Sequence, residues 1–405
     1  MPETNTTPAE TADHRSEPRA RFLEGYALPV QDLRQAVRSR IITVDTDLPD
    51  SSFQPASLDL RLGTVAYRLR CSFLPGPERV EDALRHYAMD RLDLSEGAVL
   101  DTNRPYLIPL QEQLSLPETM FARANPRSST GRLDIFTRLV TDRSEQFDDV
   151  RPGYRGRLYL EVVPRSFAIK VTTGQALCQM RLFTGAPGLT DYDVVDVHRT
   201  TPILHGEREP IAVDDLRVRE GLFLSVDLSG RAAPNQLVGY RARKNAPLLD
   251  LAALGQADPA EFWEPIYAES RKVLVLETEA FYLLHSRERV RIPHDLAADM
   301  AAFDASAGEL RTHYAGFFDP GFGDRGKAAP GAHAVLEVRA HDVPFAVAHG
   351  QRICKLAFQR LREPSSNPYG PNIGSRYNES ALVLLPRQFK GSEGGAQALL
   401  PVDAR

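Results

Sequence analysis

Cysteine is scarce in this chain of 405 residues. The three cysteines, Cys71, Cys178 and Cys354, are an odd number, and no two of them form a CxxC pair. This scarcity excludes a disulfide framework and leaves zinc too few sulfur ligands. His205-Gly206-Glu207 has a His-x-Glu spacing that can accompany zinc, but without a cysteine pair we interpret it as a loop or surface segment. We expect a reducing, cytoplasmic location.

Long apolar runs and an excess of basic charge are also missing. No run approaches the ~18 to 20 residues that span a bilayer, and residues 1–18 lack the apolar core of a signal peptide. We therefore expect no membrane partner and a disordered tail over residues 1–20. The 49 basic and 54 acidic residues give a net charge of -5, which disfavours binding to polymeric nucleic acid because the phosphate backbone attracts basic surfaces.

What the chain does contain is the composition of a globular protein, with 42% hydrophobic and 25% charged residues. Its length predicts two or three domains. An internal repeat decides the number, because several segments recur 176 residues later. Tyr106-Leu107-Ile108 is matched by Tyr282-Leu283-Leu284, Leu160-Glu161-Val162 by Leu336-Glu337-Val338, and Gly174-Gln175 by Gly350-Gln351. We predict two modules, at residues 21–213 and 214–405.

Within each module the pattern indicates short strands separated by glycine and proline. Expected strands include residues 158–163, 167–171, 273–276 and 334–338, and the clearest expected helix covers residues 30–37. The prediction is a mainly β chain with two tandem barrel or jelly-roll modules and a few short helices. Periodicity alone does not distinguish a jelly roll from a sandwich.

One hexapeptide has the chemistry of a phosphate site. Arg127-Ser128-Ser129-Thr130-Gly131-Arg132 combines two guanidinium groups, three hydroxyls and a glycine. Arginine presents a planar fork to phosphate oxygens, hydroxyls donate, and glycine lets backbone N–H groups approach a ligand. A polar turn without a ligand is the alternative for this segment taken alone.

A glutamate stands inside an apolar strand in each module, as Glu161 and as Glu337. A buried carboxylate is costly unless it is paired or its pKa rises, so both are candidate acid–base groups. An exposed edge strand would explain one such glutamate, but two at equivalent positions make that explanation weaker.

These motifs, together with Gln54-Pro55-Ala56-Ser57-Leu58-Asp59-Leu60-Arg61-Leu62-Gly63 and Pro152-Gly153-Tyr154-Arg155-Gly156, resemble those of the dCTP deaminase family. The resemblance runs through nearly the whole chain twice and implies a fused pair of modules with the fold shared by dUTP pyrophosphatases (a β-clip). It implies metal-independent hydrolysis of dCTP to dUTP and ammonia, which supplies dUTP for thymidylate synthesis. No tightly bound cofactor is implied, Mg²⁺ would accompany the nucleotide, and the chains would form a homo-oligomer with modules in a trimeric arrangement.

The resemblance also implies roles for particular residues. The strand glutamate, Glu337 or Glu161, would shuttle protons, and Ser128 would help hold the attacking water. Three residues would bind the triphosphate: Arg127, Ser129 and Arg132. Asp319 would bind the deoxyribose, and a C-terminal closing segment would add Tyr369 over the sugar or base and Arg376 over phosphate.

Each module departs from the family pattern in a different place. The phosphate motif of module 1 is replaced by Asp304-Ala305-Ser306-Ala307-Gly308-Glu309 in module 2, whereas the motif aspartate is kept as Asp319 in module 2 but is Arg151 in module 1. Complementary losses predict a composite site, with phosphates on module 1 and base and sugar on module 2, and therefore favour Glu337. A site within module 1 using Glu161, with Asp148 or Asp149 in place of the missing aspartate, stays open.

Two other functions stay open as well. A dUTP pyrophosphatase, or a bifunctional deaminase and pyrophosphatase, would use the motif aspartate as base with a tyrosine three residues later. Module 1 keeps only that tyrosine, Tyr154, and module 2 keeps Asp319 but has Phe322. A non-catalytic nucleotide-binding module is the second alternative.

Overall fold

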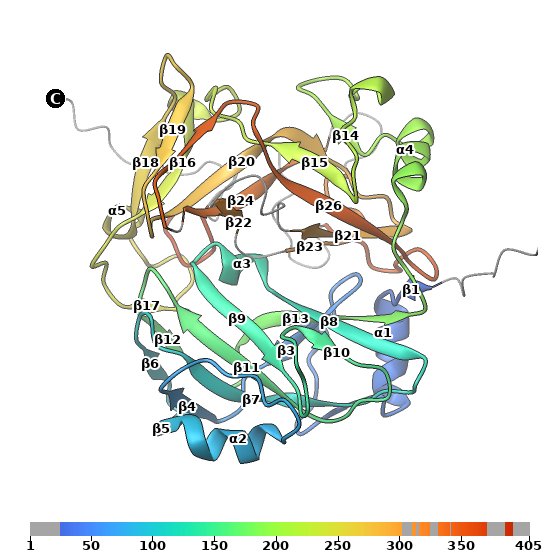
Figure 1. The fold of residues 1–405 in the computed structure, drawn as a ribbon, viewed down its shortest axis with the longest axis vertical. Coiled ribbons are helices and arrows are strands. Elements are labelled where there is room, and N and C mark those ends of the chain that lie inside the picture. The colour runs from blue at the N-terminus through green and yellow to red at the C-terminus, as the bar shows by residue number, and fades with distance from the viewer. Residues whose placement is uncertain are drawn as a thin grey trace, which may run out of the picture.

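The computed structural model describes residues 25–301, 310–312, 316–324, 331–340, 342–370 and 385–391. The tail expected at residues 1–20, the degenerate loop at residues 304–309 and Arg376 lie outside these ranges. The mainly β prediction is confirmed, because strands make up most of the regular structure that is described. Figure 1 shows the N-terminal half of the chain, in blue and green, packed against the C-terminal half, in yellow and red.

Module 1 is built on two sheets. The order of the first is β5-β4-β7-β11-β9, with β2 also paired to β7; these strands are β5 (Ala88–Asp93), β4 (Val65–Leu69), β7 (Tyr106–Ser115), β11 (Arg155–Pro164), β9 (Ile135–Val140) and β2 (Ile42–Val44). The order of the second is β1-β13-β8-β10, with β3 also paired to β13; these strands are β1 (Tyr26–Ala27), β13 (Ala176–Thr184), β8 (Met120–Pro126), β10 (Asp149–Val150) and β3 (Leu58–Arg61).

Module 2 repeats this topology. Its first sheet has the order β18-β16-β20-β24-β22; these strands are β18 (Trp263–Tyr267), β16 (Leu237–Ala242), β20 (Phe281–Val290), β24 (Ala332–Ala340) and β22 (Leu310–Thr312). A further strand, β14 (Leu204–His205), precedes the predicted boundary at residue 214 but pairs with β20 in this sheet. Its second sheet is β15-β26-β21-β23; these strands are β15 (Leu222–Ser225), β26 (Arg352–Arg360), β21 (Leu296–Ala301) and β23 (Phe317–Phe318). The register agrees too, since Glu161 faces Leu107 and Glu337 faces Leu283.

Two small sheets show where the halves differ. In module 1, β12 (Ile169–Val171) pairs with β6 (Ala98–Leu100) and, in parallel, with β17 (Leu249–Asp250) from module 2. The corresponding sheet of module 2 consists of β19 (Val273–Leu276) and β25 (Phe345–Ala348). The segment after β16 therefore reaches across to complete a sheet of the other module (Figure 1).

Helices are few and short. They are α1 (Val30–Arg38), α2 (Val80–Tyr87), α3 (Ser128–Gly131), α4 (Asp191–Thr200) and α5 (Pro259–Phe262). The helix expected at residues 30–37 is confirmed as α1, which buries Val30 and Leu33, while Val37 is half-buried against the same core. Helix α4 begins with a capping box between Thr190 and Asp193, and its Val194 packs in the second core. Single turns of 3-10 helix occur at Asp50–Ser52, Val213–Asp215 and Pro234–Gln236.

Each module encloses its own apolar core. The first core is formed mainly by residues between Leu28 and Leu182, but it also includes Phe281 and Leu283 from β20 of module 2. The second core is formed by residues from Val194 to Phe358. The outer face of the β20–β24 sheet is therefore covered by module 1, which fixes how the two halves pack. No helix in the described ranges is long and apolar enough to cross a membrane.

Candidate active site

A pocket lies between the two modules, and we call it the inter-module pocket. Module 1 lines it with Gln54, Asp59, Pro126, Arg127, Ser128, Arg132 and Gln179. Module 2 lines it with Met300, Gly316, Phe317, Phe318, Asp319, Phe322, His333, Val335, Glu337 and Tyr369. Six of the predicted site residues are brought together here, from segments that are up to about 240 residues apart in the chain (Arg127, Ser128, Arg132, Asp319, Glu337 and Tyr369). Ser129 is half-buried on α3 and is outside the described lining.

Helix α3 and the two arginines that flank it form the module 1 wall. Arg127 directly precedes the helix in an extended conformation, and its guanidinium lies 3.3 Å from Oδ2 of Asp59 and 3.3 Å from the carbonyl oxygen of Ala176. Ser128, the first residue of α3, is exposed, and Arg132, which follows the helix, is buried. The one-turn helix thus places two guanidinium groups and a hydroxyl at one end of the pocket, which suits an anion with several oxygens.

Asp59 from β3 sits behind Arg127. Burial raises the pKa of this carboxyl to about 6, although the charge of Arg127 acts in the opposite direction. Gln54 donates a hydrogen bond of 3.3 Å to its Oδ2. Asp59 therefore orients Arg127 and also tunes the charge of this wall near neutral pH.

Glu337 approaches α3 from module 2. Its carboxyl group lies so close to Gly131 that a Cβ at that position would be 2.4 Å from Oε2. Glycine is therefore required by contact, not by backbone conformation, if the carboxyl is to remain in place. Burial raises the pKa of Glu337 well above its ordinary value, Arg132 partly opposes the rise, and Asp134 adds to it. A raised pKa makes the carboxyl group easier to protonate, which suits a group that must both accept and return a proton.

An ion pair between the modules fixes the strand that carries Glu337. Arg339, two residues further along β24, pairs with the buried carboxylate of Asp134, which follows the α3 segment in module 1. Ser166 donates a hydrogen bond of 2.6 Å to the same carboxylate. Removing Arg339 would leave the fully buried carboxylate of Asp134 without the guanidinium that pairs with it, so the pair holds β24 and the α3 segment in register.

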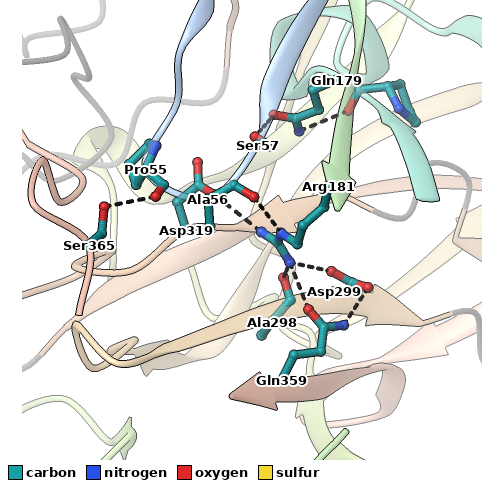
Figure 2. A network of polar contacts seen from close by, with 11 residues as sticks. Pro55, Ala56, Ser57, Gln179, Arg181, Ala298, Asp299, Asp319, Gln359 and Ser365 are labelled. Atoms are coloured by element: carbon teal, nitrogen blue, oxygen red, sulfur yellow. Dashed lines mark hydrogen bonds and ion pairs between the residues drawn. The ribbon is translucent and has the colours of Figure 1, made fainter. Parts of the chain in front are cut away.

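Asp319 is held by an arginine from the opposite module. Arg181 of β13 is fully buried, and its Nη2 donates to Asp319 across 3.2 Å (Figure 2). Its Nη1 donates to Asp299 at 2.7 Å and to Gln359 at 2.9 Å, and its Nε donates to the carbonyl oxygen of Ala56. Burial raises the pKa of both aspartates, and Arg181 opposes the rise. Asp319 is therefore held in the pocket by a hydrogen-bond network to which both modules contribute.

Aromatic rings cover the far side of the pocket. Phe322 makes an edge contact with Phe318 at 5.1 Å between ring centroids and with Tyr369 at 5.5 Å. The Tyr369 backbone N–H donates to the carbonyl oxygen of Pro320 at 2.7 Å. Just before it, Ser365 donates to the carbonyl oxygen of Pro55 in module 1 at 2.8 Å, as Figure 2 shows. The chain leading to Tyr369 is therefore anchored on both modules.

Glu161 lies elsewhere, in a different environment from its counterpart. Ser72 donates a hydrogen bond of 2.9 Å to Oε1 of Glu161, and α2 with Phe73 and Tyr87 covers this face of the sheet. Burial raises the pKa of Glu161, and the hydrogen bond from Ser72 and the charge of Arg138 lower it. Glu337 is covered by residues of module 1, the opposite module. Glu161 is instead covered by residues of module 1 itself, the module to which it belongs.

Sequence reasoning missed three residues of this site: Asp59, Arg181 and His333. Asp59 stood inside a quoted motif but was given no role. Arg181 carried the same signal as the strand glutamates, a charge within an apolar strand, and that signal could have found it. His333 gave no sequence signal, because its position depends on how β24 faces module 1.

The fold and the pocket define a duplicated β-barrel protein with a composite, arginine-lined site. The protein-family model for the N-terminal domain of 2'-deoxycytidine 5'-triphosphate deaminase matches residues 24–186, and the family model for its C-terminal domain matches residues 190–389. A crystal structure of 2'-deoxycytidine 5'-triphosphate deaminase from Agrobacterium tumefaciens is 44% identical, with a TM-score of 0.79 over 84% of this chain and 97% of that one.

Shorter relatives match as well. A "dCTP deaminase, dUMP-forming" from Halobacterium salinarum is 31% identical over 37% of this chain and 76% of its own length. A "dCTP deaminase" from Natronomonas pharaonis is 31% identical over 33% of this chain and 68% of its own length. The chain therefore belongs to the dCTP deaminase family and is a hydrolase of that family, with its N- and C-terminal domains in one polypeptide.

Proposed function

We propose that this protein deaminates dCTP hydrolytically to dUTP and ammonia in the inter-module pocket. The observation that carries the proposal is the contact between the Glu337 carboxyl group of module 2 and the α3 turn of module 1, in one pocket with Arg127, Ser128 and Arg132. The proton carrier and the phosphate-binding groups implied by the family resemblance thus meet at one place, although they come from different modules.

The proposed reaction uses Glu337 twice. As a carboxylate it takes a proton from a water molecule while the water oxygen forms a bond to C4 of the cytosine, and the proton is passed to N3. Glu337 then takes the proton of the new hydroxyl group on C4 and delivers it to the amino nitrogen, the C4–N4 bond breaks, ammonia leaves, and C4 becomes the carbonyl carbon of uracil. The buried setting of Glu337 raises its pKa and so favours the protonated form that returns the proton later in the cycle. Ser128 helps to hold the water.

The remaining groups bind the nucleotide. Arg127, Arg132 and Ser129 hold the triphosphate, and Arg376, outside the described residues, is proposed to add a further positive charge. Mg²⁺ accompanies the nucleotide through phosphate oxygens, the hard ligands it prefers. Asp319 and Tyr369 hold the deoxyribose. A homo-oligomer is part of the proposal, and light scattering of the purified protein would measure the number of chains.

The experiment that tests the proposal compares Glu337→Gln with its matched control, Glu161→Gln. Glutamine keeps the shape but carries no transferable proton, so turnover of Glu337→Gln should fall at least about 100-fold while nucleotide binding survives. Glu161→Gln should stay within a few-fold of the parent, because Ser72 and α2 cover that carboxyl. An inactive Glu161 variant beside a normal Glu337 variant would move the reaction into module 1.

A second activity is favoured by one observation: the Halobacterium salinarum relative, among others, is named as dUMP-forming. In that reaction Asp319 takes a proton from a water molecule that attacks the α-phosphate, the bond between the α- and β-phosphates breaks, and pyrophosphate leaves. Incubation with dCTP, and separately with dUTP, should be scored for ammonia and for pyrophosphate. Ammonia without pyrophosphate supports the deaminase alone, pyrophosphate from both nucleotides supports a bifunctional enzyme, and binding without either product supports a non-catalytic module.

The expected lack of a zinc requirement has its own test. Turnover should survive a zinc-selective chelator, because the sequence offers no cysteine pair for a zinc deaminase site. Loss of activity that zinc alone restores would contradict the proposed mechanism.

A further inference from the structure

The strand that carries Glu337 presents a second polar side chain to the inter-module pocket. Side chains alternate along a strand, so His333, Val335 and Glu337 of β24 share one face, and all three line the pocket. His333 is half-buried at the start of the strand. Nothing in the proposed reaction uses it.

The orientation of His333 is fixed by a bulge in the neighbouring strand. The register between β20 and β24 shifts between His285 and Arg289, which turns the Ser286 carbonyl oxygen toward β24. Nδ1 of His333 lies 2.7 Å from that oxygen, and Ser286 Oγ accepts a hydrogen bond of 2.8 Å from the Ala334 N–H. Since a carbonyl oxygen only accepts, the His333 Nδ1 carries the proton and Nε2 is left as an acceptor.

The protonation state agrees with this geometry. Burial and the neighbouring His285 ring, 5.3 Å away, lower the pKa of His333 to about 4. The imidazole is therefore neutral at physiological pH, and its Nε2 can accept a hydrogen bond from a ligand but cannot donate one.

The polar cluster is peculiar to the module that provides Glu337. The residues of module 1 that correspond to His285, Ser286 and His333, 176 positions earlier, are Pro109, Leu110 and the exposed Arg157. Module 1 has the same bulge, because the register between β7 and β11 also shifts at Arg157. A structural need for the bulge thus accounts for neither histidine.

Position along the strand decides which part of the substrate His333 meets. His333 is four positions before Glu337, which is about 13 Å at the rise of an extended strand, too far for contact with the reacting carbon. The turn that carries Asp319 packs instead on the start of β24, where a Cβ on Gly323 would lie 2.9 Å from the Ala332 nitrogen. Asp319, His333 and Glu337 line the same pocket, so we take a nucleotide with C4 at Glu337 to place its sugar beside Asp319 and His333.

We propose that Nε2 of His333 accepts a hydrogen bond from the 3'-hydroxyl of the deoxyribose and so selects nucleotides that carry this group. This inference rests on the proposed function for the orientation of the nucleotide. One oxygen of Asp319 is already engaged by Arg181. A single hydroxyl donates one hydrogen bond, so the second oxygen of Asp319 and Nε2 of His333 compete for it, and the test below compares the two acceptors.

The test compares dCTP with 2',3'-dideoxy-CTP on the same protein preparation, so that any inactive fraction cancels in the ratio of kcat/KM. The parent should favour dCTP about three- to tenfold, the scale of one neutral hydrogen bond. His333→Phe should bring the ratio close to one, and His333→Gln, which restores an acceptor, should recover most of the preference. A ratio unchanged in His333→Phe, or lost only in Asp319→Asn, overturns the inference.

A second readout separates this inference from the proposed function. Dissociation constants of both nucleotides are measured by calorimetry on Glu337→Gln and on the double variant with His333→Phe. If the parent releases no ammonia, the proposed function fails, but the binding ratio still reports on His333. If ammonia is released and the binding ratio does not respond to His333→Phe, only the inference on His333 fails.

Discussion

Arg181 offers a quantitative test of how the two modules build one site. The side chain is fully buried, and it pairs with Asp299 at 2.7 Å and with Asp319 at 3.2 Å, both in the other module. Arg181→Met keeps an unbranched side chain of comparable length but leaves two carboxylates buried without their counterion. Breaking a buried pair in this way costs about 3 to 5 kcal/mol.

A matched control is available on the neighbouring strand. Arg123 of β8 pairs with Asp149 at 3.2 Å, but both side chains are about half exposed, so Arg123→Met should change stability by at most about 1 kcal/mol. Urea denaturation at pH 7.5 measures the free energy of unfolding of both variants. Equal decreases in this free energy would refute the conclusion that the buried pair matters more than the exposed one.

The pH dependence of the Arg181 variant gives a second check. Without the guanidinium, the pKa values of Asp299 and Asp319 rise further above their unfolded values, so the folded variant binds more protons than the unfolded chain. Its stability relative to the parent must then increase as pH falls from 7.5 toward 5. The KM for dCTP should also rise, because Asp319 loses its orientation. A deficit independent of pH would show that lost packing, rather than unpaired charge, is the cause.

Three further predictions concern module 1. Arg132→Ala should weaken dCTP binding by roughly 1.5 to 3 kcal/mol, as measured by calorimetry, whereas an effect under a few tenths would remove it from the phosphate site. For Asp59→Asn, the free energy of unfolding measured in urea should rise relative to that of the parent by up to about 3 kcal/mol as pH increases from about 4 to above 6. The reason is that the raised pKa of Asp59, about 6, makes ionisation costly to the folded parent. A difference that does not change with pH would contradict this. Gly131→Val should displace the Glu337 carboxyl and lower kcat about 100-fold with little change in melting temperature, whereas Gly188→Ala, which meets open space, should be normal.

Much of the site was predictable because its residues belong to local motifs. The hexapeptide around Ser128 predicts a phosphate site from side-chain chemistry, and the glutamate in each apolar strand predicts a perturbed carboxyl, as the structure has it for Glu161 and Glu337. The repeat at 176 residues likewise predicted the two copies of one sheet topology. These features depend on residue type and spacing, which the sequence contains in full.

The choice between the two strand glutamates is different, because it depends on what packs against each sheet. Equal spacing makes Glu161 and Glu337 equivalent in sequence, yet α2 and Ser72 cover one while α3 of the other module meets the second. The complementary losses favoured Glu337, but only the packing of one module on the other separates the two environments. The roles of Arg181 and His333 are decided in the same way, since each acts on a partner more than 45 residues away in the chain. Local pattern determined which groups this protein carries, and the tertiary structure decided which of them meet, because contacts between distant segments are set by how whole sheets pack.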